Sequence, residues 1–152
     1  MKRLSAFLVA AFLAALSCGA HAQERATESE AQAMVRKAVA FYKKNGKGKT
    51  VAELVKSPGP YVDRDLYVTL YTLDGVLLAH INPKIIGKNL MELRDPDGKP
   101  FVRERIEAAR SSASGWQDYK FFNPVSKKVE PKRMYWERHD DLVFACGAYK
   151  KT

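Results

Sequence analysis

Apolar residues recur at three- and four-residue spacing after position 26, which places them on one face of an α-helix. Thr27 and Glu30 have the spacing of a capping box at its start, and Asn45-Gly46 is a helix stop. The pattern therefore predicts a long helix over residues 27–44. Its buried face would consist of Ala31, Met34, Val35, Ala38, Phe41 and Tyr42.

A shorter helix is predicted directly after the first. Thr50 and Glu53 repeat the capping-box spacing, and the Pro-Gly-Pro run at 58–60 ends the helix because proline lacks a backbone donor and clashes with the preceding turn. The apolar positions of this helix are Val51, Leu54 and Val55.

From residue 66 onward, short segments rich in aromatic and β-branched residues alternate with turn peptides, which is typical of strands. The first two segments, at 66–72 and 76–81, flank Asp74-Gly75 and so predict an antiparallel hairpin. Three more strands are expected at 116–122, 133–138 and 142–149, joined by turns at 123–124 and 140–141.

Two further segments lie between the hairpin and the later strands. Residues 82–100 are rich in Pro-containing and Gly-containing turn peptides and predict a long ordered loop with room for one helical turn. A helix is expected from Pro100, ending before Gly115. Together these elements predict an α+β domain with one antiparallel sheet of about five strands, a long N-terminal helix and a helical crossover. The crossover helix would bury Phe101, Val102, Ile106 and Ala109.

The start of the chain has the three parts of a secretory signal. Two basic residues precede an apolar run over residues 4–16, and the Ala-His-Ala triplet at 20–22 matches a cleavage site. The apolar run is about a dozen residues, too short for a bilayer span of about 20. We expect cleavage after Ala22, which leaves a soluble periplasmic domain over residues 23–152.

The two cysteines bear on anchoring and on redox chemistry. Cys18 leaves a lipid anchor open as an alternative, although the preceding Ala15-Leu16-Ser17 has Ala where a lipobox usually has Leu. After cleavage Cys146 is the sole cysteine, so no intramolecular disulfide can form. Its apolar neighbours predict a buried thiol that behaves as a small hydrophobe.

The formal charge is +9, and it falls to +7 when Lys2 and Arg3 are removed with the signal peptide. This charge keeps open a second class of function, a basic envelope protein that binds acidic lipid or another polyanion. However, the basic residues are spread along the chain, and their densest run, at 43–49, falls where the helix dipole favours cations. Nucleic acid is therefore not an expected partner.

Enzymatic and metal sites are not indicated by the sequence. The mature chain has only His80 and His139, Cys146 lies in an apolar strand, and no serine occupies a Gly-x-Ser-x-Gly elbow. The histidines and the cysteine lack the spacing of zinc ligands. We expect neither catalysis nor a metal or other cofactor.

Aromatic and polar side chains gather in or beside the predicted strands. Phenols, an indole, an imidazole and an ammonium can direct several donors at a carboxylate while they pack its carbon skeleton. His80 could instead bond to loop backbone. Trp116 and Tyr119 would share a face only if a bulge interrupts their strand or the ligand enters from its end. The candidate ligand-binding residues are Tyr71, His80, Trp116, Tyr119, Lys132, Tyr135 and Tyr149, with Tyr67 on the same face as Tyr71.

Short motifs follow one another in a characteristic order between residues 74 and 149. They are Asp74-Gly75, Ala79-His80, Asn82-Pro83-Lys84, Gly87-Lys88-Asn89-Leu90, Asp95-Pro96-Asp97-Gly98-Lys99-Pro100, Gly115-Trp116, Asn123-Pro124, Pro131-Lys132, Tyr135 and Gly147-Ala148-Tyr149. In order and spacing this set resembles the single Cache domain family of extracellular, PAS-like sensor domains.

The resemblance implies a sensor-type domain that binds a short organic acid. We expect a monocarboxylate of two to four carbons, with Lys132 as its charge partner and the aromatic residues as walls. Family members often carry proline where this chain has Ile81, which could change how His80 points. Family sensors usually continue into a signalling module, but we expect none after Thr152. The resemblance therefore implies a stand-alone form that acts through a membrane receptor or transporter, and a homodimer through the N-terminal helix is a further expectation.

Overall fold

The structure, a computed structural model, describes residues 24–150. The expected signal peptide and Cys18 lie outside the described residues. Within the described part of the chain, no helix is both long enough and apolar enough to cross a membrane.

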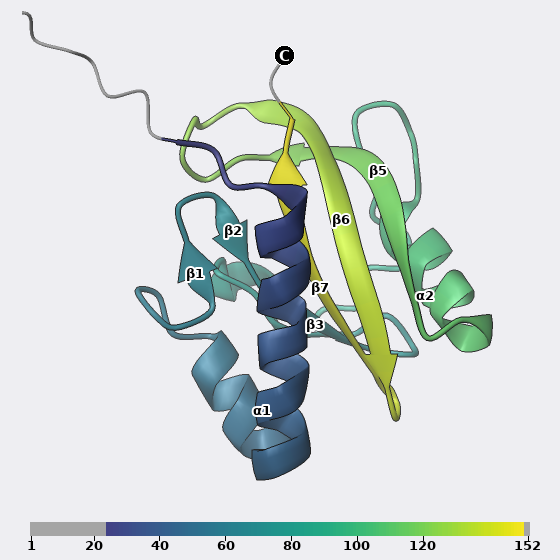
Figure 1. Ribbon diagram of the computed structural model, residues 1–152. Coiled ribbons are helices and arrows are strands. Elements are labelled where there is room, and N and C mark those ends of the chain that lie inside the picture. The colour runs from purple at the N-terminus through teal and green to yellow at the C-terminus, as the bar shows by residue number, and fades with distance from the viewer. Residues whose placement is uncertain (1–23, 151–152) are drawn as a thin grey trace, which may run out of the picture.

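One antiparallel sheet of five strands organises the domain (Figure 1). Its strand order is β4 (Leu77–Ala79), β3 (Thr69–Thr72), β7 (Leu142–Tyr149), β6 (Val129–His139) and β5 (Ser114–Phe122). This sheet and its helices confirm the predicted α+β class. The strand expected at 66–72 is interrupted at Val68, so that β2 (Leu66–Tyr67) pairs with an unexpected β1 (Val62–Asp63) in a separate small sheet.

Helix α1 (Glu28–Leu54) contains both of the predicted N-terminal helices, joined across a kink at Gly46 (φ 76°, ψ 175°). The capping box at Thr27 is formed as predicted, and the second part of α1 folds back beside the first (Figure 1). The expectation that Thr50 caps the second part is wrong. Thr50 lies inside the helix, where its hydroxyl donates to the Gly46 carbonyl (2.8 Å). The break between the two parts of the helix lies earlier, at Gly46, because its positive φ changes the direction of the chain.

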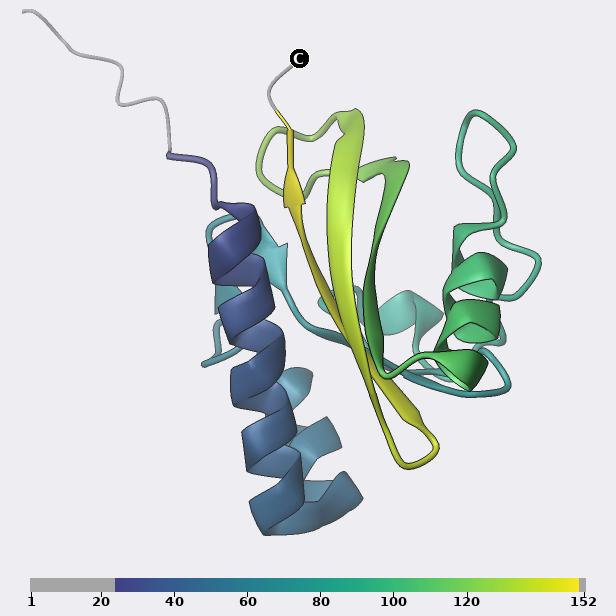
Figure 2. The same cartoon turned by 45° about the vertical axis from the view of Figure 1, so that its right-hand side comes forward.

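The two faces of the sheet carry separate cores. Helix α1 covers one face, and α2 (Phe101–Ser111) lies on the other, together with the loop over 82–100 and its 3₁₀ turn η1 (Pro83–Ile85) (Figure 2). We call these the α1 face and the α2 face. The predicted buried positions of α2 are confirmed: Phe101, Val102, Ile106 and Ala109 are all buried.

Strand alternation assigns each strand residue to one of these faces. On β6, Met134 and Trp136 belong to the core under α2, whereas Tyr135 belongs to the core under α1. On β7, Cys146 faces α1 and is fully buried, which confirms the predicted buried thiol. Burial raises the pKa of that thiol to about 12, so it remains protonated at neutral pH.

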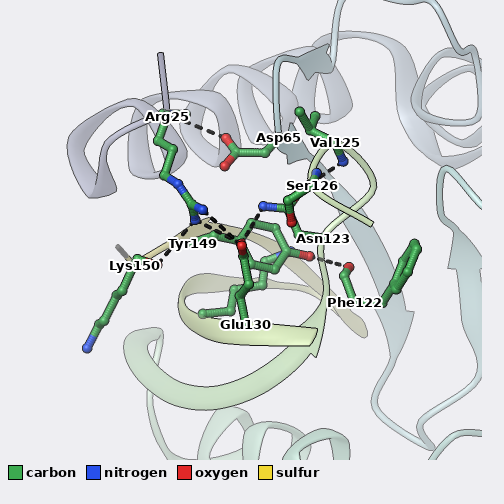
Figure 3. A network of polar contacts seen from close by, with 11 residues as sticks. Arg25, Asp65, Phe122, Asn123, Val125, Ser126, Glu130, Tyr149 and Lys150 are labelled. Atoms are coloured by element: carbon green, nitrogen blue, oxygen red, sulfur yellow. Dashed lines mark hydrogen bonds and ion pairs between the residues drawn. The ribbon is translucent and has the colours of Figure 1, made fainter. Parts of the chain in front are cut away.

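A partly buried polar network ties the start of the described chain to the β5–β6 hairpin and to the last strand (Figure 3). Arg25 donates to both carboxylate oxygens of Glu130 (2.8 and 2.9 Å) and to the carbonyl of Lys150 (3.2 Å). Asn123 also donates to Glu130 (2.8 Å), which is only 5% exposed. The Arg25 guanidinium is the main cause that lowers the pKa of Glu130 to about 2.

We expect Glu130→Gln to lower the free energy of unfolding by about 1 to 3 kcal/mol at neutral pH, because Arg25 loses its charged partner. The folded-state pKa of Glu130 lies below its ordinary value of 4.5, so its contribution is present above pH 4.5 and is lost as pH falls toward about 2. Urea unfolding at pH 7 and at pH 3 measures this difference, and exposed Glu107→Gln is the matched control. A stability loss in Glu130→Gln that does not shrink at low pH would contradict the assignment.

Candidate functional site

Two cations are buried on the α2 face of the sheet. Lys132 on β6 is 0% exposed, and Arg105 on α2 is 1% exposed. Arginine and lysine are rarely buried without a charge partner, because removing a cation from water costs several kcal/mol. These two residues therefore define the candidate site.

The ammonium of Lys132 is enclosed by phenol rings. Its Nζ donates to the Tyr149 hydroxyl (3.3 Å) and lies 3.9 Å from the ring centroid of Tyr67 and 4.4 Å from that of Tyr149. No ion pair among residues 24–150 involves Lys132. Burial, with a further contribution from the positive charge of Arg105, lowers the pKa of Lys132 from 10.5 to about 7.

The local sequence explains why this lysine points inward. Lys132 pairs across the sheet with Tyr119 on one side and with Tyr149 on the other, so the three side chains share a face. Gly147 leaves space for the lysine stem, since a Cβ at this position would lie 2.8 Å from the Lys132 Cε. In the Gly-Ala-Tyr segment at 147–149, the glycine thus leaves space for the Lys132 side chain and the tyrosine accepts a hydrogen bond from its ammonium.

Arg105 packs its guanidinium against aromatic rings. Its Cζ lies 5.5 Å from the ring centroids of both Tyr71 and Tyr119, and 5.9 Å from that of Phe101. None of its three side-chain nitrogens has a hydrogen-bond partner among the described residues. Cation–π contacts offset part of the desolvation cost, but five N–H donors remain available to an anion.

Arg105 was not among the residues predicted from the sequence, although a signal was present. It lies three residues after Val102 and four after Phe101, on the stripe that the helix pattern assigned to the core. An arginine on the buried stripe of a short helix indicates either a buried ion pair or a ligand contact.

His80 closes another side of this region. It is 6% exposed, and its ring lies edge-on to Tyr67 with the ring centroids 5.0 Å apart. Its Nδ1 accepts from the backbone N–H of Asn82 (2.9 Å), so the neutral ring carries its proton on Nε2. Burial first, and then the charge of Lys132, lowers the pKa of His80 to about 4. His80 thus makes the loop-backbone bond, is neutral at pH 7 and keeps Nε2–H as a donor.

The predicted tyrosines on the α2 face form a connected group. Tyr149 donates to the carbonyl of Phe122 (2.7 Å), so its hydroxyl oxygen accepts from Lys132 and from the Tyr67 hydroxyl (3.2 Å). Tyr119 stacks on Phe101 with the ring centroids 4.3 Å apart. Burial raises the pKa of Tyr67, Tyr119 and Tyr149 well above 10, so these phenols remain protonated donors.

The structure does not bring Trp116 and Tyr135 to this group, so the expectation that they line the same pocket as Lys132 is wrong. Strand β5 pairs with β6 in regular register from end to end, without the bulge that would have turned Trp116 toward Tyr119. Trp116 instead pairs with Tyr135, their ring centroids 4.9 Å apart, on the α1 face. Tyr135 donates to Glu137 (2.8 Å).

Three hollows lie near the buried cations, and one of about 420 Å³ has Arg105 in its wall. A charged pocket of about 250 Å³ has Lys132 and Tyr119 in its wall, along with Asp95, Asp97 and Asp118 and three further lysines. An apolar groove of about 590 Å³ has Tyr67 and His80 in its wall but neither of the buried cations. Among residues 24–150, no cluster of three or more His, Cys, Asp or Glu residues is arranged to hold a metal ion.

Comparison with known proteins identifies relatives of this domain. A family model described as single Cache domain 2 matches residues 17–149. The chain is similar to the crystal structure of a methyl-accepting chemotaxis protein from Vibrio parahaemolyticus, with 27% sequence identity, a TM-score of 0.68, and coverage of 80% of this chain and 86% of that chain. No match was found among curated proteins.

Two more solved structures share the fold. The periplasmic sensor domain of a chemotaxis protein has 22% identity and a TM-score of 0.63, covering 81% of this chain and 90% of that chain. A Cache chemosensory domain, described for its recognition of carboxylic acids, has 18% identity and a TM-score of 0.63, covering 81% and 88%.

Proposed function

Since the chain belongs to the single Cache domain family, we propose that it is a periplasmic sensor-type domain that binds a short organic acid between the sheet and α2. The observation that carries this proposal is the pair of buried cations, Lys132 and Arg105, which lack an anionic partner among residues 24–150. A ligand carboxylate would neutralise charge that the ligand-free domain keeps buried at a cost.

Each residue of the site has a role in this proposal. Lys132 is the charge partner, and Arg105 can offer two parallel N–H donors to a carboxylate. The Nε2–H of His80 completes the set of donors, the hydroxyl oxygen of Tyr149 holds the Lys132 ammonium in place, and Tyr71 and Tyr119 form apolar walls. Recognition of carboxylic acids by another Cache chemosensory domain supports the ligand class.

Location and partners are also part of the proposal. Export with cleavage after Ala22 follows from the signal pattern, and the relatives in chemotaxis proteins support a sensor role outside the cytoplasm. We propose that the complex acts on a membrane receptor or transporter, with a homodimer through α1 as the arrangement to test first.

Titration calorimetry with acetate, propanoate and butanoate tests the proposed ligand class, with the matching neutral amides as controls. We expect the acids to bind and the amides not to bind, because only the acids supply the missing charge. Affinity should fall by up to about tenfold per pH unit above pH 7, because Lys132, with a pKa of about 7, must then take up a proton on binding.

Equal affinity for propanoate and propanamide would contradict a charge-based site. If no acid binds at millimolar concentration, the domain more closely fits the alternative of a basic envelope protein that binds a polyanion.

A further inference from the structure

The apolar groove beside His80 is larger than a two-carbon to four-carbon acid requires. Its volume of about 590 Å³ falls within the range of small-molecule sites, roughly 300 to 1,000 Å³. It lies between the loop over 82–100 and the end of β5, and most of its wall is hydrocarbon. The apolar side chains are Ile81, Pro83, Ile85, Leu93, Phe121, Phe122 and Pro124.

Two of these side chains are exposed although they are large and apolar. Phe122 is 48% exposed and Leu93 is 36% exposed. They come from segments far apart in the chain yet line the same groove. Single exposed apolar residues need no explanation, but a groove that combines them with five further apolar side chains indicates a binding surface.

The groove adjoins the proposed carboxylate site. Tyr67 lines the groove and also lies with its ring centroid 3.9 Å from the Lys132 Nζ, so a single ring separates the ammonium from the hollow. His80 lines the groove and packs edge-on against the same ring. Phe122 lines it as well, and its carbonyl accepts from Tyr149.

We propose that the groove is the tail subsite of an amphipathic ligand, a carboxylic acid with an unbranched hydrocarbon chain of about six to ten carbons. The carboxylate lies at the Lys132 end, past Tyr67 and His80, and the chain extends along the groove toward Leu93 and Phe122. This inference rests on the proposed function and widens its ligand class. An acid of two to four carbons would occupy only the carboxylate position beside Lys132, and the groove would remain filled with water.

A chain-length series tests the inference. Calorimetry compares butanoate, hexanoate, octanoate and decanoate, all below their critical micelle concentrations. Each added methylene that enters the groove should tighten binding by about two- to fourfold, the range for a partly to fully buried methylene. In the double variant Leu93→Ser, Phe122→Ser this gain per methylene should be largely lost, while butanoate affinity should stay within about twofold.

The controls separate this inference from the proposed function. Val55→Ser removes an apolar side chain of similar exposure, 39%, outside the groove, and it should leave the series unchanged. Affinity that stays flat beyond butanoate, or a rise with chain length that survives in the double variant, would overturn the tail subsite while the carboxylate site stands. If no acid of any length binds, the proposed function fails, and the inference fails with it.

Discussion

Replacing Lys132 with methionine is expected to remove most carboxylate binding and to make the ligand-free domain more stable. Affinity should fall by about 2 to 5 kcal/mol, the usual loss when one member of a buried charge pair is truncated. The free energy of unfolding should rise by about 1 to 4 kcal/mol, because methionine keeps most of the stem and removes a buried charge that has no carboxylate partner among residues 24–150.

Calorimetry and urea unfolding measure the two effects on the same variant. The stability gain should be largest at and below pH 7 and should shrink as pH rises toward 10.5, where the lysine is neutral in both the folded and the unfolded chain. Exposed Lys128→Met is the matched control and should change neither quantity. A variant that binds as the parent does would remove Lys132 from the site, and one that loses stability would show that the lysine serves the fold instead.

Arg105→Met should weaken binding by a similar amount, about 2 to 5 kcal/mol, if the guanidinium and the ammonium hold the same carboxylate. The orphaned donors of Arg105 are the reason for this expectation: none of its three nitrogens has a hydrogen-bond partner among the described residues. Arg103→Met is the matched control on the same helix and should bind as the parent does, because the Arg103 side chain is 39% exposed and pairs with Glu92 outside the site.

A double-mutant cycle decides whether the two cations act together. The combined loss in Lys132→Met, Arg105→Met should be clearly smaller than the sum of the single losses, because once one contact to the carboxylate is gone the other is poorly positioned. Strictly additive losses would indicate that the two residues contact separate parts of the ligand or separate ligands.

The periodicity of apolar residues predicted helices and strands well where one face of the element is almost entirely apolar. Helix α2 buries the four apolar residues expected of it, and β7 matches its predicted bounds at 142–149 because nearly every side chain in it is apolar. The pattern failed at Val68 and Thr50. At Thr50 the chain direction is set by the positive φ of Gly46, and at Val68 the strand is interrupted where the backbone N–H bonds to the Tyr61 carbonyl. Neither feature leaves a periodic signal.

The candidate site was predicted only in part, for two physical reasons. The odd separation of Trp116 and Tyr119 already implied opposite faces, but only the register of β5 against β6 shows that Trp116 is the one turned away. Arg105 was overlooked because arginine usually marks the solvent side of a helix, and its burial depends on aromatic residues from distant strands.

The hydrogen bonds of Arg25 to Glu130 and Lys150 have a consequence for local unfolding of the domain. One guanidinium holds the hairpin carboxylate of Glu130 and the backbone of Lys150, residues 105 and 125 positions away in the chain. The segment that leads into α1 and the end of β7 are thereby joined without a covalent bond. Fraying at one end removes the contact that restrains the other, so the two ends should open as one cooperative unit rather than peel away independently.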